Sequence, residues 1–217
     1  SQAVNVPELV QSLYRGYASQ ATSILPSFMP GYSADVTQTE YNPEEAQKVL
    51  ADKGVTELHM LAYTNPRPYN TATGQTLAEA LQGYWSKVGI TCTIDAYDWT
   101  TYKEKIGTGD YDVCLYGWIG DNGDPDNFLN LLDSEDIEIN LAQYHNEEYS
   151  QMLAAAASLP NGDERNAAYG EMEQKIADEN VWLPISHQEN LAAYVSNVQN
   201  FIYHPTGNTY LSQTYKN

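Results

Sequence analysis

The sequence predicts an α/β fold in which helices cover both faces of a parallel, doubly wound sheet, giving three layers. Three observations predict it: short apolar segments of strand length, amphipathic segments of helical spacing between them, and helix caps at their borders. Two successive strand–helix–strand units imply parallel strands joined by right-handed crossovers. The 217 residues suit one large domain or two small ones, and an apolar fraction of 42% is enough for a core.

The first elements are defined by their ends. Apolar residues at helical spacing predict a helix over residues 6–14. Residues 17–41 are expected to be irregular, because prolines and a glycine interrupt them. Asn42 and Pro43, followed by two glutamates, are a strong helix start, and Gly54 is the matching C-terminal stop.

The remaining elements follow in a regular order. The alternating central part predicts strands at residues 57–63, 90–97 and 111–118, with helices at residues 73–88 and 100–106. After Phe128 the pattern is mostly helical, with helices at residues 147–159 and 163–178. Short strands are expected at residues 181–186, 190–195 and 201–204, and a polar tail begins at Pro205.

Composition excludes several classes of function. The net charge is −19 with only 10 Lys+Arg, so a polyanion would be repelled and no nucleic acid is expected as a partner. No stretch approaches the roughly 20 apolar residues that cross a bilayer. The chain begins inside a predicted helical segment without a signal peptide, which leads us to expect a piece of a longer protein.

The sequence lacks the common catalytic and cofactor motifs. It contains no GxGxxG, P-loop, HExxH or GxSxG pattern, and its two cysteines and four histidines have no metal-ligand spacing. The histidines are interpreted as structural or surface residues. We therefore expect no cofactor, no metal and no enzymatic activity.

One dense polar segment follows the third strand directly. It reads GWIGDNGDPDNF and begins at Gly117. Gly120 and a second glycine flank Asp121, so the backbone can approach a ligand there or turn sharply. Asp124 and Asp126 are assigned a structural role, because Asp-Pro is typical of a capped helix start. An EF-hand fits poorly, since its third and sixth positions would be Gly and Asp.

A second polar segment, NPRPYN, follows the first strand. Its Arg67 lies between two prolines, which hold the backbone extended and suit recognition of a carboxylate by both guanidinium nitrogens. Taken alone, Arg67 is more readily interpreted as a solvent-exposed residue of a proline-rich loop. Ligands of doubly wound sheets bind beyond the carboxyl ends of the strands, and neighbouring strands lie ~4.8 Å apart. If the first and third strands are neighbours, Arg67 and Asp121 are placed to face a zwitterion with charges roughly 7 Å apart, the span of two extended residues.

These segments closely resemble the dipeptide- and oligopeptide-binding proteins of family 5 of the extracytoplasmic solute-binding proteins of ABC importers. The specific matches are GWIGDNGDPDNF and RPYN, supported by VPELVQSLYRG, NPEEAQKVLADKG and YWSKVGITCTIDAYDW. By resemblance, Asp121 holds the α-ammonium group of a peptide and Arg67 holds its carboxylate. Trp118 lines a side-chain pocket, and Gly120 belongs to the same ligand-binding loop.

The resemblance also implies an architecture and a setting. Residues 1–217 would be the C-terminal lobe of a two-lobe protein of the type II periplasmic-binding-protein fold, with residues 1–200 as its core and residues 201–217 returning to the other lobe. The protein would be a monomer outside the cytoplasm, periplasmic or lipid-anchored at the outer face of the membrane. Its partners would be a short peptide and the transmembrane subunits of an ABC importer.

Three other functions stay open at this stage. The same fold carries haem, nickel chelates or sugars in related proteins. A hydrolase using a pair of carboxylates, such as Asp121 and Asp124, would need one acid with a raised pKa beside an ionised partner. A calcium-dependent adhesion domain is the third.

The two cysteines are predicted to be free thiols. Cys92 and Cys114 lie on the second and third predicted strands, and in the fold of the resembling family the first strand lies between these two. Two strand spacings separate them by ~10 Å, whereas a disulfide needs Cα atoms within about 7 Å.

Overall fold

A computed structural model describes residues 1–204 and 206–217, and its centre is a parallel sheet of three strands. The strands are β2 (Glu57–Tyr63), β3 (Thr91–Tyr97) and β4 (Val113–Cys114), in the order β3-β2-β4. The register pairs Leu58 with Cys92 and Leu61 with Cys114, so β2 separates the two cysteines. Both cysteines are free, as predicted.

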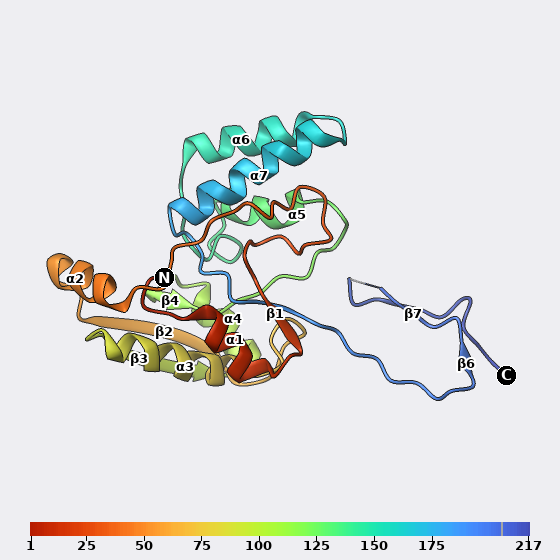
Figure 1. The fold of residues 1–217 in the computed structure, drawn as a ribbon, viewed down its shortest axis with the longest axis horizontal. Helices are drawn as coiled ribbons and strands as arrows, with labels where there is room; N and C mark the ends of the chain where they lie inside the picture. Colours follow the sequence, from red (N-terminus) through yellow and green to blue (C-terminus); the bar gives the residue numbers. More distant parts are fainter. Residues whose placement is uncertain (205) are drawn as a thin grey trace.

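Helices cover both faces of this sheet. Helices α3 (Gly74–Lys87) and α4 (Trp99–Ile106) are the crossovers between the strands. Because β3 and β4 lie on opposite sides of β2, right-handed crossovers place the two helices on opposite faces. In Figure 1, α3 and α1 (Val6–Tyr14) lie in front of the sheet and α4 lies behind it. Residues 60–63 of β2 are buried in succession, as expected for a strand covered on both sides. The predicted three-layer α/β fold is confirmed.

The helix ends form where local chemistry predicts them. Asn42 caps α2 (Pro43–Lys53), because its side chain accepts a hydrogen bond from Glu45 N–H at 3.0 Å. Gly54 closes that helix with a φ of 69°, a left-handed conformation that glycine adopts without strain. Thr73 caps α3 and Asp98 caps α4 in the same way.

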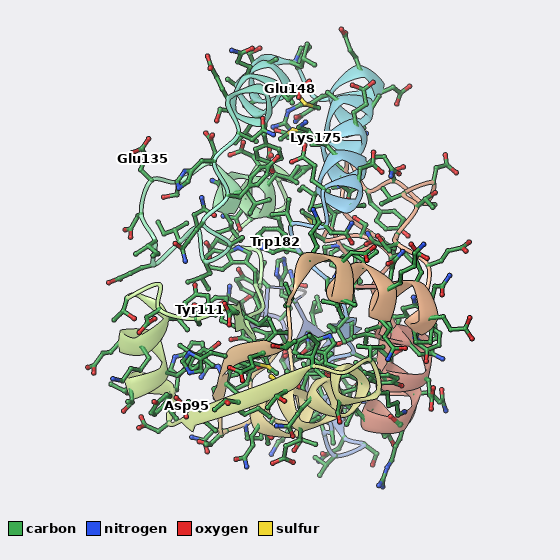
Figure 2. All side chains as sticks on the ribbon, turned by 90° about the vertical axis from the view of Figure 1, so that its left-hand side faces the viewer. Asp95, Tyr111, Glu135, Glu148, Lys175 and Trp182 are labelled. Atoms are coloured by element: carbon green, nitrogen blue, oxygen red, sulfur yellow. The ribbon has the colours of Figure 1, made fainter. Side chains whose placement is uncertain are left out.

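A second, helical part packs beside the sheet. It comprises α5 (Asp126–Leu129), the short 3₁₀ turn η1 (Asn130–Leu132), α6 (Glu147–Ser158) and α7 (Asp163–Asp178). Helices α6 and α7 lie side by side above the sheet (Figure 1). This part has its own core, made by residues of all four elements: Leu129, Leu132, Tyr149, Leu153, Ala156, Tyr169, Met172 and Ile176. Trp182 lies below α7, between the helical part and the sheet (Figure 2).

The third strand is shorter than its apolar pattern predicts. Strand β4 ends at Cys114 instead of continuing to residue 118. The reason is Tyr102 of α4, whose hydroxyl donates to Leu115 O at 2.5 Å and accepts from Leu115 N–H at 3.0 Å. A side chain thus takes both backbone groups that would continue the ladder.

Two further strand predictions were inaccurate. Residues 17–41 are not wholly irregular, since β1 (Ala18–Gln20) pairs antiparallel with β5 (Ser186–Gln188). That pairing joins segments far apart in the sequence, which no local pattern reveals. Residues 190–195 form no strand, and residues 181–186 contribute only Ser186 to one. Residues 190–195 are exposed and pair with no neighbouring strand among the described residues.

The C-terminal segment extends away from the body as two narrow ladders (Figure 1). Strand β6 (Val198–Gln199) pairs with β9 (Tyr215–Lys216), and β7 (Ile202–Tyr203) pairs with β8 (Thr209–Tyr210). Pro205, where the polar tail is predicted to begin, lies outside the described residues. Several large apolar side chains of the segment are exposed: Leu191, Tyr194, Val195, Ile202, Tyr203, Tyr210, Leu211 and Tyr215. Among the described helices, none has the length and apolar character needed to cross a membrane.

Candidate ligand-binding site

Two loops meet at the carboxyl edge of the sheet. The loop of Arg67 leaves the end of β2, and the loop of Asp121 leaves the end of the neighbouring strand β4. They are in direct contact, because a Cβ atom at Gly117 would overlap the ring of Tyr69. The absence of a side chain at Gly117 therefore lets the two predicted ligand-binding segments pack together.

The Arg67 loop is a tight turn anchored by a buried asparagine. Arg67 and Asn70 exchange backbone hydrogen bonds of 2.9 and 2.8 Å. The Asn70 side chain donates to Tyr63 OH at 3.0 Å and accepts from Tyr14 OH at 3.0 Å. The asparagine of the RPYN segment thus holds the turn on β2 and α1, and the turn presents Arg67.

An aromatic surface supports the Arg67 guanidinium. Its Cζ atom lies 3.9 Å from the ring centroid of Trp99, a cation–π contact. Trp99 in turn stacks on Tyr102 and Tyr116, with ring centroids 5.8 and 5.7 Å apart. The Nε atom of Arg67 is buried and has no hydrogen-bond acceptor among the described residues. Within the same residues no carboxylate pairs with Arg67.

Asp121 is held by its own loop and remains accessible. The Asn127 side chain accepts a hydrogen bond from Asp121 N–H at 2.9 Å and donates to Asp121 Oδ2 at 3.4 Å. The same amide oxygen accepts from Trp118 Nε1 at 3.0 Å. Asp121 is exposed, and within the described part of the chain no basic side chain pairs with it. Gly120 is required beneath the loop, since a Cβ atom there would lie 2.9 Å from the ring of Phe128.

The other two aspartates of the loop face the protein. Asp124 accepts hydrogen bonds from Asp126 N–H at 3.0 Å and from Arg165 at 2.9 Å. Although burial opposes it, these hydrogen bonds hold the pKa of Asp124 below its usual range. Burial and the nearby Asp124 carboxylate raise the pKa of Asp126. These contacts agree with the structural role predicted for both residues.

The histidines do not gather at this site. His59 lies 3.0 Å from Asp95, and His187 Nε2 is 3.2 Å from the carbonyl oxygen of Ser23. Among the described residues no group of three or more His, Cys, Asp or Glu side chains could hold a metal ion. The geometry offers no support for a calcium loop.

Sequence reasoning missed three side chains that shape the site. Trp99 and Tyr116 support Arg67, and Arg165 pairs with Asp124 from helix α7. Trp99 follows the capping residue Asp98, which is a helix-start signal rather than a ligand signal. Arg165 is 41 positions from its partner, so no local pattern could have found it.

A sequence profile of the bacterial extracellular solute-binding proteins, family 5 Middle, matches residues 1–139. The chain belongs to this family. The similar proteins named below are binding proteins. The prediction of a family 5 protein from the two loops is confirmed.

Family 5 relatives of known ligand resemble the chain over most of its length. It is 30% identical to di/tripeptide-binding protein 3 of Pseudomonas aeruginosa, over 85% of this chain and 36% of the relative. It is 28% identical to heme-binding protein A of Haemophilus influenzae, over 94% of this chain and 38% of the relative. The dipeptide-binding protein of Pseudoalteromonas sp. SM9913, solved with Met-Leu, is 25% identical with a TM-score of 0.88, covering all of this chain and 44% of that protein. The chain thus spans less than half the length of these family 5 proteins.

Proposed function

We propose that this chain is the C-terminal lobe of the solute-binding component of an ABC importer, and that it binds short peptides by their charged termini. The observation that carries the proposal is the pair of unpaired charges at one sheet edge. Arg67 presents a guanidinium that has no carboxylate partner in the described part of the chain, and Asp121 presents an accessible carboxylate on the adjoining loop. A short peptide at neutral pH is the complementary ligand, with an ammonium group at one end and a carboxylate at the other.

Each site residue has a defined part in this proposal. Asp121 binds the ammonium group, and Arg67 binds the carboxylate while Trp99 supports its face. Trp118 is 36% exposed, so its ring is available to line a side-chain pocket. Gly120 lets the loop backbone approach Phe128 closely, because a Cβ atom there would lie 2.9 Å from the Phe128 ring.

The remainder of the protein follows from the same proposal. Residues 1–200 form the lobe core, and residues 201–217 return to an N-terminal lobe that closes over the ligand. The exposed apolar side chains of the C-terminal segment support this arrangement, because they need a partner surface. The protein acts as a monomer outside the cytoplasm, in the periplasm or held by a lipid anchor, and delivers its ligand to the importer's transmembrane subunits.

Haem is the second candidate ligand, because one relative is named a heme-binding protein. The site geometry favours the peptide. Arg67 suits a propionate group, but Asp121 would place a further negative charge beside a ligand whose two propionates already carry two.

Calorimetric titration of the full-length protein tests the proposal, with dipeptides and haem as separate ligands. We expect dipeptides to bind and haem to give neither heat nor a shifted absorption band. Mass spectrometry of ligand carried through native purification provides a second readout. Saturable haem binding without dipeptide binding would contradict the peptide proposal.

A further inference from the structure

A buried arginine on helix α7 reaches the back of the Asp121 loop. Arg165 has a side-chain exposure of only 9%, and its Nη2 atom lies 2.9 Å from Asp124 Oδ1. The same nitrogen donates to Tyr169 OH at 2.8 Å, and Cζ lies 4.8 Å from the Tyr169 ring centroid. Nη1 donates to Asn161 Oδ1 at 3.4 Å. The guanidinium is therefore held by Tyr169 and Asn161 as well as by Asp124 of the loop.

From Asp124 a short series of hydrogen bonds leads to Asp121. The Asp124 carbonyl accepts from Asn127 N–H at 3.2 Å, which fixes the backbone of Asn127. The Asn127 amide then holds Asp121 through its N–H and its carboxylate. Asp124 N–H also donates to Asn122 Oδ1 at 2.9 Å, which closes the turn between them. The position of Asp121 thus depends on where Asp124 is held.

The Asp121 loop contacts α7 through the polar Arg165–Asp124 pair. A hollow of about 360 Å³ lies between them, lined by Asn122, Asp124, Asp126, Asn127, Asn130, Ala157 and Arg165. Loosely packed space of this kind lets a loop shift when its tie is removed. Arg165 and Asp124 both line this hollow, and their 2.9 Å ion pair ties the loop to the helix.

We propose that Arg165 is a positioning residue for ligand binding, which holds Asp121 in the geometry that grips a peptide's ammonium group. The inference rests on the proposed function and adds a residue outside the two ligand loops. Arg165 acts through Asp124 and Asn127 and does not touch the ligand. Its loss should therefore affect the part of the affinity that depends on a free amino terminus.

The test compares a free dipeptide with its N-acetylated form in the full-length protein. The dissociation constant of the N-acetylated dipeptide divided by that of the free dipeptide measures the contribution of the ammonium group. Arg165→Met should lower this ratio by roughly two-fold to a hundred-fold, the range of coupling seen within one hydrogen-bonded network. The affinity for the N-acetylated dipeptide should stay unchanged. A merely structural role would lower thermal stability and leave the ratio as it is.

A matched control comes from the same helix. Lys175 of α7 pairs with Glu148 of α6 at 2.6 Å and with Glu179 at 2.8 Å. Figure 2 labels Lys175 and Glu148 near each other on these two helices. Lys175→Met also removes an ion pair of α7, but one that does not touch the Asp121 loop. It should leave the ratio at the wild-type value.

Two further variants make every outcome decisive. If the proposed function is right, Asp121→Asn should bring the ratio close to one. An unchanged ratio in this variant would show that the proposed function itself is wrong. If Asp121→Asn collapses the ratio and Arg165→Met does not, only the positioning proposal is overturned. Should Arg165→Met fail to fold, Arg165→Gln decides, because a glutamine stays polar but carries no charge to pair with Asp124. A lowered ratio supports the proposal, and a wild-type ratio refutes it.

Discussion

The side-chain amide of Asn127 holds Asp121 through two hydrogen bonds, accepting from its N–H at 2.9 Å and donating to its carboxylate at 3.4 Å. The same amide oxygen binds the Trp118 indole at 3.0 Å. One residue at the start of a short helix thus orients both the charged and the aromatic group of the loop.

Asn127→Ala should weaken binding of free dipeptides by roughly five- to a hundred-fold, because Asp121 and Trp118 both lose their shared partner. Titration calorimetry of the full-length protein measures the change. Asn130→Ala is the matched control, since Asn130 is an exposed residue one turn further on. Equal affinities for the Asn127 and Asn130 variants would show that the amide does not orient the site.

Asp121→Asn and Arg67→Ala should each cut affinity for free dipeptides by roughly thirty-fold to several thousand-fold, the cost of breaking a charge pair in a closed cleft. The losses should be chemically separable. Asp121→Asn should matter less for N-acetylated peptides, and Arg67→Ala should matter less for C-amidated ones. If both variants bind free dipeptides like the wild type, the assignment of these residues is wrong. If Arg67→Ala alone leaves the affinity for free dipeptides unchanged, the site takes longer peptides whose carboxylate lies elsewhere.

Trp99→Leu should lower affinity for peptides with a free carboxylate by roughly three- to thirty-fold, because Arg67 loses its cation–π support. Affinity for C-amidated peptides should change less. Trp99→Phe retains an aromatic face and should recover most of the binding. An equal loss for both kinds of peptide would show that Trp99 acts on general packing, since its ring also contacts Tyr63 and Tyr102.

Stability should decline with rising pH because of one buried carboxyl group. Glu173 of α7 is 2% exposed and binds Ser23 Oγ and the N–H groups of Leu25 and Ser33. Burial raises its pKa from the ordinary 4.5 to about 7. The protonated form is therefore favoured by folding, so its stabilisation is complete below pH 4.5 and is lost as the pH rises through 7.

Chemical unfolding between pH 5 and 8 measures this effect. The free energy of unfolding should fall by at most about 1.4 kcal/mol per pH unit from this group. Glu173→Gln should remove that slope, whereas Glu171→Gln, an exposed neighbour on the same helix, should retain it. Identical slopes in the two variants would assign the pH dependence to other groups.

Much of the fold was readable from local chemistry. The cap at Asn42, the stop at Gly54 and the apolar spacing of α3 act within a few residues, and the structure places elements there. The strand order was inferred from the family resemblance. The profile match and the Met-Leu-bound relative support the family, while the roles of Arg67 and Asp121 stay predictions.

Contacts between distant segments could not be predicted from local sequence patterns. Tyr102 ends β4 by binding the backbone of Leu115, and Glu173 holds a loop about 140 to 150 positions away. The Arg165–Asp124 pair likewise joins residues 41 positions apart. Residue type and spacing set helices and strands because those depend on neighbours along the chain. Which buried polar groups meet depends on the path of the whole backbone, and only the tertiary structure brings those partners within hydrogen-bonding distance.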